Sequence, residues 1–209
     1  MNDVSPPTSA TLLGKIGEND QEAWERFVRL YGPLVYNWCR NAGLQAADGA
    51  DVVQIVLQTV MTKIQSFDPG RKSAGAFRSW LWGITRHRIL DHFRNKGKGT
   101  PGIGGSDANI RLARLEQEPN EPESVSGTTA RQLLLKSAIE ILRAEFDPRT
   151  WQAFWRMAVD GNPASAVGEE LDMSSKAVRQ AKFRVTKKLR GLLQDDLPDV
   201  FGPLKVPEA

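Results

Sequence analysis

The sequence has very little cysteine and no long apolar run, and both shortages exclude classes of protein. Cys39 is the single cysteine among 209 residues, so an internal disulfide and a multi-cysteine zinc site are excluded, and a reducing compartment fits. No apolar run approaches the roughly 20 residues that a membrane span needs. The acidic, proline-containing N-terminus is not typical of a signal peptide. We therefore expect a soluble, cytoplasmic protein without membrane insertion.

Charge is abundant but almost balanced, and its distribution is more informative than its sum. The formal net charge is only +3, although the sequence pI is about 9.1. Cations clustered in particular stretches suit a polyanionic partner such as nucleic acid. The apolar content of 40% is modest, so we expect small helical cores in one domain or two.

The stretch from 162 to 190 has the clearest local organisation. It predicts a short helix from Pro163 to Leu171, with Asn162 as its N-cap, and a longer helix from Ser175 to Arg190. Three residues connect them, and Ser174 can cap the second helix. A short helix, a three-residue turn and a second helix form the layout of a helix-turn-helix, in which the second helix enters the major groove.

The second of these helices is amphipathic and basic. Val178, Ala181, Val185 and Leu189 recur at helical spacing and predict one buried stripe. The other faces carry seven cations and no acid. These cations are Lys176, Arg179, Lys182, Arg184, Lys187, Lys188 and Arg190. The alternative is a solvated cationic face on an ordinary bundle helix.

A second stretch, from Phe77 to Asn95, interleaves aromatic rings with cations. Phe77, Trp80, Leu81, Ile84 and Ile89 can face a core, whereas Trp82 falls off that stripe, and we expect it to meet unpaired bases. Bases stack on aromatic rings while guanidinium groups hold phosphates, so the pattern suits single-stranded nucleic acid. The alternative is a set of core aromatics beside a solvated basic edge.

The remaining patterns predict an all-α protein with two small helical domains joined by a linker. Pro33 should divide the first long apolar pattern into two helices or bend it. Glycine, proline and glutamate dominate the linker, which could not bury enough apolar surface to fold alone, apart from a short helix around Ile110 to Leu115. The predicted parts are a flexible N-terminus (1–18), a first domain (19–96), a flexible linker (97–127), a second domain (128–194) and a loose tail (195–209).

The ordered series of these patterns resembles a bacterial sigma factor of the sigma-70 family, in the extracytoplasmic-function (ECF) group, which keeps only regions 2 and 4. No single motif carries the resemblance. In region 2 the matching residues are Ala50 to Gln54, Phe77 to Leu81, Ile84, Asp91 and Arg94. In region 4 they are Gly161, Val167, Leu171, Met173, Ser174, Val178 and Lys188 to Arg190.

The resemblance implies three binding surfaces and no cofactor, metal or catalytic residue. Asp51 and Gln54 match the helix that docks on core RNA polymerase. The residues implied for binding and melting the −10 promoter element are Phe67, Arg71, Lys72, Arg78, Trp80, Trp82, Arg86, His87 and Arg88. Those implied for the −35 element are Ser175, Lys176, Arg179, Gln180, Arg184 and Lys187. The implied partners are core RNA polymerase, promoter DNA and an anti-sigma factor or other inhibitor, and we expect a monomer when free.

One departure from the family pattern concerns the predicted turn. Asp172 stands where glycine is usual, but aspartate tolerates left-handed backbone better than most residues, so we expect the turn to survive.

Two other functions compete with the sigma-factor interpretation. A stand-alone helix-turn-helix regulator would need a ligand pocket or dimer face in the first domain. An enzyme would need a site such as a metal cluster of His87, Asp91 and His92. His92 points about 100° away from Asp91 on a helix, however, and no third ligand is near in the sequence. We expect no enzymatic activity.

Overall fold

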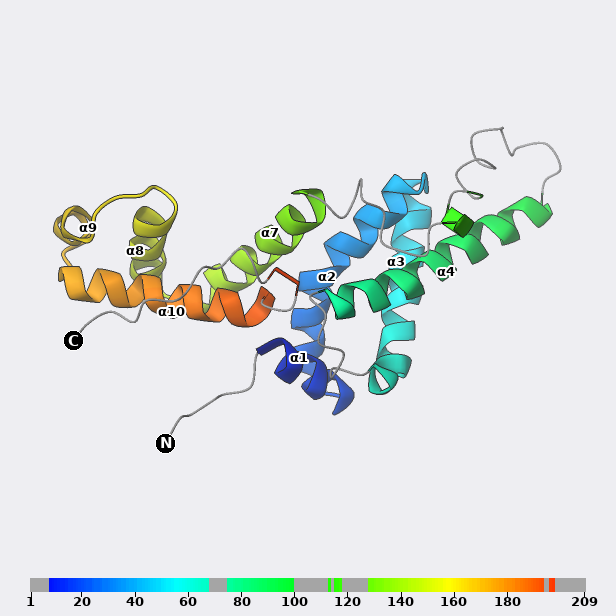
Figure 1. The fold of residues 1–209 in the computed structure, drawn as a ribbon, viewed down its shortest axis with the longest axis horizontal. Coiled ribbons are helices and arrows are strands. Elements are labelled where there is room, and N and C mark those ends of the chain that lie inside the picture. The colour runs from blue at the N-terminus through cyan, green and yellow to red at the C-terminus, as the bar shows by residue number, and fades with distance from the viewer. Residues whose placement is uncertain are drawn as a thin grey trace.

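The computed structural model describes residues 8–67, 75–99, 113, 115–117, 128–193 and 196–197. Every regular element within these ranges is helical, which confirms the predicted all-α class (Figure 1). Arg71 and Lys72 lie outside the described residues. The elements are α1 (Thr8–Gly17), α2 (Gln21–Asn41), α3 (Ala46–Lys63), η1 (Ile64–Ser66), α4 (Ala76–Gly99), α7 (Thr128–Glu145), α8 (Pro148–Ala158), α9 (Ala164–Leu171) and α10 (Ser175–Leu193).

Helix α2 is the central element of the N-terminal bundle. The Asp20 side chain caps it by accepting a hydrogen bond from the Ala23 N–H over 2.9 Å. Its apolar face, which includes Phe27 and Leu34, is buried against α3 and α4. Pro33 lies inside one continuous helix, so the alternative of two separate helices is wrong. The proline side chain is exposed, which keeps its ring out of the packed face.

Residues 8–17 form a helix, contrary to the flexible segment predicted for residues 1–18. Residues 8–17 form α1, in which Leu12 and Ile16 are buried. These two side chains are four residues apart and therefore share one face of the helix. That face packs against α2 and α10, so two apolar residues in a polar stretch were enough to fix the segment.

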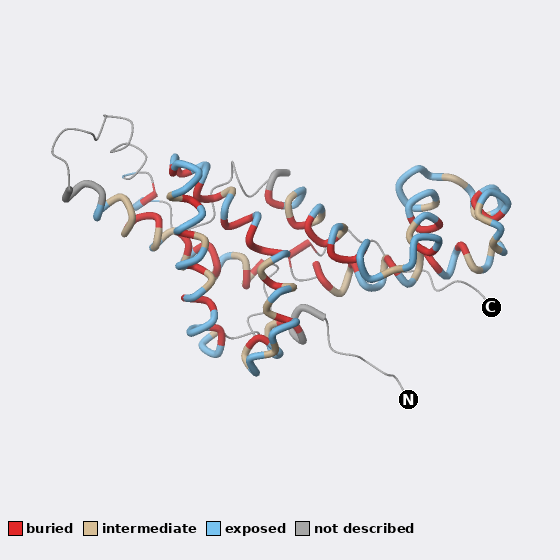
Figure 2. The backbone as a smooth tube through the Cα atoms, turned by 180° about the vertical axis from the view of Figure 1, so that it is seen from behind, coloured by how far each residue is buried: buried red, intermediate tan, exposed pale blue. Residues whose placement is uncertain are grey.

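The N-terminal and C-terminal helices share one apolar core rather than forming two separate ones. Leu134, Ala138 and Leu142 of α7 face α2, and the end of α10 adds Leu189 and Leu193 to the same core. Figure 2 shows the buried residues continuing from the central bundle along α7 and the end of α10. Only the far end, with α8, α9 and the start of α10, has a small core of its own (Figure 1).

Described pieces of the predicted linker and tail also belong to this core. Leu115 and Leu197 are buried in it, and the Tyr31 hydroxyl donates a hydrogen bond to Asp196 Oδ2 over 2.7 Å. The expectation of a flexible linker is therefore wrong at 115–117, and that of a loose tail is wrong at 196–197. Helix α4 also continues to Gly99, three residues beyond the predicted boundary.

Candidate nucleic-acid interface

The helix pair predicted from residues 162 to 190 is present, but α9 begins at Ala164 with Pro163 in the N-cap position and no side-chain cap, so the prediction of Asn162 as the N-cap is wrong. The turn that follows α9 depends on backbone geometry at two positions. Asp172 ends α9 with φ 51° and ψ 51°, which confirms the expected left-handed conformation. A side chain at Gly168 would place its Cβ 2.5 Å from the Met173 carbonyl oxygen, so only glycine lets the turn fold back this closely. The sequence analysis overlooked this requirement.

Side chains around the turn hold its two helices in register. Ser174 caps α10 as predicted, with its hydroxyl oxygen accepting a hydrogen bond from the Ala177 N–H over 3.1 Å. Arg149 of α8 donates to the carbonyl oxygens of Leu171 and Asp172. The guanidinium group therefore satisfies carbonyls that the end of α9 leaves without helical partners. Contacts from α8 and the cap of α10 thus hold α9 in place relative to α10.

Helix α10 separates its apolar and basic faces, as the periodicity predicts. Val178, Ala181 and Val185 are fully buried, whereas the side chains predicted to read DNA point away from them. Arg184 lies at the edge of this surface, where Nη2 is 3.4 Å from Thr150 Oγ1. The exposed members are Lys176, Arg179, Gln180, Arg184 and Lys187, and Ser175 is half-buried.

Lys188, one of the seven predicted cations, is engaged by the protein itself. Lys188 Nζ lies 2.7 Å from Glu145 Oε2 and 5.3 Å from the centre of the Phe146 ring. Lys188 therefore links the C-terminal half of α10 to the end of α7. Its charge is paired with Glu145, so fewer cations face solvent toward the C-terminal end of α10.

Helix α8 packs through a different face from the one the sequence indicates. Helical spacing places Trp151, Phe154, Trp155 and Ala158 on one apolar face, yet Trp155 is 36% exposed and Ala158 is also exposed. The buried face instead combines Phe154 with Thr150 and Ala153. Thr150 and Ala153 lie on the side of α8 that packs against α10. The two tryptophans line an open groove of about 630 Å³ between α7 and α8.

Trp82 of α4 is a core residue, which corrects the prediction that it faces DNA. Its side chain is only 1% exposed and packs edge-on against Trp38, with ring centres 5.4 Å apart. It shares a buried stripe with Thr85 and Ile89 at i, i+3 and i+7. That stripe was hidden in the sequence because Thr85 is polar; its hydroxyl donates to the Leu81 carbonyl over 2.8 Å.

The other aromatic side chains at the start of α4 form a partly open cluster. Phe67, which follows η1, packs against Phe77 and Trp80 at ring-centre distances of 5.3 and 5.4 Å. Phe67 and Trp80 are both half-buried, so part of each ring is accessible. Among the described residues, these are the aromatic groups that remain available on the predicted −10 surface.

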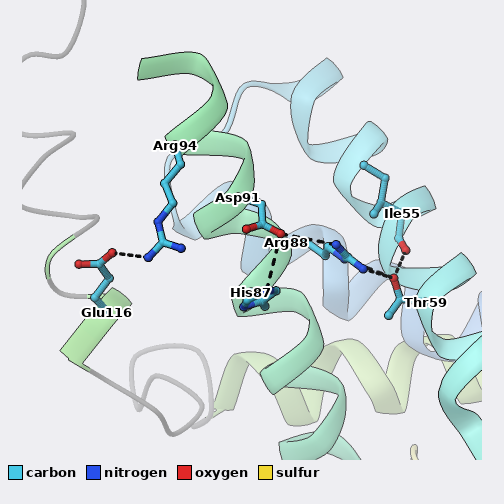
Figure 3. Close-up of polar contacts among 7 residues, drawn as sticks. All are labelled: Ile55, Thr59, His87, Arg88, Asp91, Arg94 and Glu116. Atoms are coloured by element: carbon cyan, nitrogen blue, oxygen red, sulfur yellow. Dashed lines mark hydrogen bonds and ion pairs between the residues drawn. The ribbon is translucent and has the colours of Figure 1, made fainter. Parts of the chain in front are cut away.

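Several α4 cations that were predicted to bind DNA contact other parts of the chain. Arg88 lies between Thr59 Oγ1, at 3.2 Å, and Asp91, at 3.5 Å (Figure 3). His87 is exposed, with Nε2 3.8 Å from Asp91 Oδ2. Arg78 Nη1 donates to the Asp196 carbonyl over 3.3 Å. His87 is therefore the most open of these groups, and Arg88 is fastened to α3.

The surface of α3 opposite the core carries the residues predicted to bind polymerase. Asp51 and Gln54 are exposed and lie three positions apart, so they share one side of the helix. Two large apolar side chains also reach solvent on α3, with Ile55 44% and Met61 49% exposed. These two apolar side chains lie outside the buried positions Val52, Val56 and Val60, and that offset is the feature of the sequence that could have indicated an exposed apolar surface.

The geometry also bears on the competing interpretations. His87 and His92 face different carboxylates, because His92 Nε2 lies 3.8 Å from Asp48 Oδ2. Within the described residues, no group of three His, Cys, Asp or Glu side chains could hold a metal ion.

None of the helices described here is long and apolar enough to cross a bilayer. Burial raises the pKa of the Cys39 thiol to about 12, so the thiol is neutral near pH 7 and packs as an apolar side chain.

Comparisons with known proteins agree with the resemblance. Residues 27–99 match the family model of Sigma-70 region 2. The ECF RNA polymerase sigma factor ShbA of Streptomyces griseus subsp. griseus is 23% identical over 198 residues, covering 93% of this chain and all of the relative. A solved structure of CnrH in complex with the cytosolic domain of CnrY is 22% identical over 90% of this chain and 99% of CnrH, with a TM-score of 0.37. Residues 27–99 therefore match Sigma-70 region 2, and the chain as a whole is similar to an RNA polymerase sigma factor of the extracytoplasmic-function group.

Proposed function

We propose that this protein is a sigma factor, which binds core RNA polymerase, recognises −35 and −10 promoter elements and promotes DNA melting at the start of transcription. The observation that carries the proposal is the exposed basic face of α10, opposite a fully buried stripe and behind a turn held by Gly168 and Arg149. A rigid support of this kind is what a helix needs in order to enter the major groove as the second helix of a helix-turn-helix.

For the −35 element, the proposed contacts are the exposed side chains at the start and middle of α10. Arg179 and Gln180 lie in the first turns, where a recognition helix meets base edges. Lys187 lies two turns further on, where a cation can hold the phosphate backbone without reading sequence. The edge position of Arg184, near Thr150, also suits a backbone contact.

For the −10 element, we propose that DNA meets the open side of α4 and its aromatic cluster. His87 is exposed, and parts of the Phe67 and Trp80 rings are accessible for stacking. Stacking of a base on an aromatic side chain is worth about 1–3 kcal/mol, which favours the unpaired state during melting. Arg71 and Lys72 remain proposed contacts on the basis of the family resemblance alone.

For polymerase, we propose that the exposed side of α3 is the docking surface. It combines the carboxylate of Asp51 and the amide of Gln54 with the apolar side chains of Ile55 and Met61. Exposed apolar side chains beside a charge are typical of a protein interface, because the apolar groups lose water on binding and the charge fixes orientation.

Run-off transcription with purified core polymerase tests the proposal. Wild-type protein should direct promoter-dependent transcripts, and Asp51→Lys should reduce holoenzyme assembly at least tenfold while leaving the circular dichroism spectrum unchanged. Glu18→Lys is a matched control, because it reverses an exposed carboxylate outside all three proposed surfaces. Promoter binding without any polymerase dependence would instead indicate a stand-alone regulator.

We also propose the setting in which this function operates. Transcription takes place in the cytoplasm, so the protein would act there, as a monomer when free and without an enzymatic role. Similarity to an RNA polymerase sigma factor supports control by an anti-sigma factor or another inhibitor.

A further inference from the structure

A short segment far along the sequence lies directly on α4. Leu115 is only 8% exposed and belongs to the apolar core that α4 shares with α2. Arg86 of α4 donates from Nε to the Leu115 carbonyl oxygen over 2.5 Å and from Nη2 to the Glu116 carbonyl oxygen over 2.7 Å. Arg94, two turns further along α4, is paired with Glu116 through Nη2 and Oε1 at 2.9 Å (Figure 3).

These contacts occupy the donors that would bind a nucleic acid backbone. A guanidinium group presents its N–H donors in a fixed fork, which matches two oxygens of a phosphate. Here two backbone carbonyl oxygens take the fork of Arg86. The Glu116 carboxylate meanwhile neutralises Arg94. Oxygen atoms of Leu115 and Glu116 therefore lie where phosphate oxygens would bind.

We propose that residues 115–117 form a clasp that masks Arg86 in the free protein and leaves α4 when DNA binds there. This inference rests on the proposed use of α4 for the −10 element. The buried Leu115 side chain is the anchor of the clasp, and the Arg94–Glu116 pair is its second fixing point. Charged phosphates are stronger acceptors for a guanidinium group than neutral carbonyls, so DNA can displace the clasp.

The clasp lowers the affinity of the free chain for DNA, because only molecules with an open clasp can bind. The apparent dissociation constant equals the intrinsic one divided by the open fraction. If the clasp is open in about one molecule in ten, releasing it strengthens binding about tenfold. The clasp thereby weakens the binding of nucleic acid to α4 in the free protein.

The test measures binding of a fluorescent single-stranded oligonucleotide to the free full-length protein by anisotropy. Leu115→Ala removes the anchor without changing any charge or any α4 residue, and it should bind about tenfold more tightly than wild type. Gln117→Ala is the matched control, because Gln117 is exposed in the same segment, and it should stay within about twofold of wild type. The gain from Leu115→Ala should disappear in the Arg86→Gln background.

Equal affinities of wild type and a folded Leu115→Ala variant would overturn the clasp, as would a gain that persists without Arg86. If the variant does not fold, hydrogen exchange of wild type decides instead: the 115–117 amides should exchange faster when oligonucleotide is added, and unchanged exchange refutes the proposal. Run-off transcription by wild type is a separate readout. A chain that transcribes normally but shows no clasp effect keeps its proposed function and loses only this inference.

Discussion

Replacing Trp82 by alanine distinguishes a core tryptophan from a DNA-facing one. The indole is 1% exposed and packs edge-on against Trp38, so its removal leaves a large cavity between α2 and α4. Truncation of a buried tryptophan to alanine costs about 3–5 kcal/mol. That is a large part of the about 5–15 kcal/mol that stabilises a typical domain.

Thermal and urea unfolding followed by circular dichroism measure this loss. In a chain of this size each kcal/mol shifts the melting temperature by about 2–4 °C, so we expect Trp82→Ala to melt about 10 °C lower. Trp155→Ala is the matched control, because that tryptophan is 36% exposed and its loss should shift melting by a few degrees at most.

A third variant separates packing from hydrogen bonding at this position. Among the described residues, Nε1 of Trp82 has no hydrogen-bond acceptor, so Trp82→Phe loses volume but no polar partner. We expect it to cost much less than Trp82→Ala. A Trp82→Ala protein that melts within about 2 °C of wild type would refute the buried position and restore the DNA-facing interpretation.

Three further predictions concern the turn, the cysteine and the DNA surface. Gly168→Ala should destabilise the helix pair by about 1–3 kcal/mol in urea unfolding, because the new methyl group meets the Met173 carbonyl; unchanged stability would contradict this close approach. Folding raises the pKa of Cys39 above its ordinary 9.0, so its stabilising contribution is complete below pH 9 and is lost as pH rises toward about 12, by up to about 1.4 kcal/mol per pH unit. Cys39→Ala should lack this pH dependence. Parallel plots of unfolding free energy against pH for wild type and Cys39→Ala would be inconsistent with a buried thiol. In promoter-binding competition with holoenzyme, Arg179→Ala should relax sequence preference while Lys187→Ala weakens all sequences alike; the reverse pattern would exchange their proposed roles.

Short-range features of this protein could be predicted from the sequence because their causes are local. Asp147 and Ser174 cap the helices that follow them, as their positions indicate. The hydrogen bond from the Thr150 N–H to the Asp147 carboxylate lowers the pKa of that carboxyl. The stripe from Val178 to Leu189 is buried because residues at helical spacing necessarily share one face.

Features that depend on which element packs against a given helix face could not be predicted in this way. Periodicity shows that α7 has an apolar face, but only the tertiary structure shows that this face packs on α2 and joins the two predicted domains in one core. The prediction that Trp82 faces DNA was wrong for the same reason. Helix α4 is covered on more than one side, and the polar residue Thr85 interrupts the apolar stripe that is visible in the sequence. Arg86 and its acceptor Leu115 are 29 residues apart in the sequence. No local sequence pattern encodes a contact at that separation.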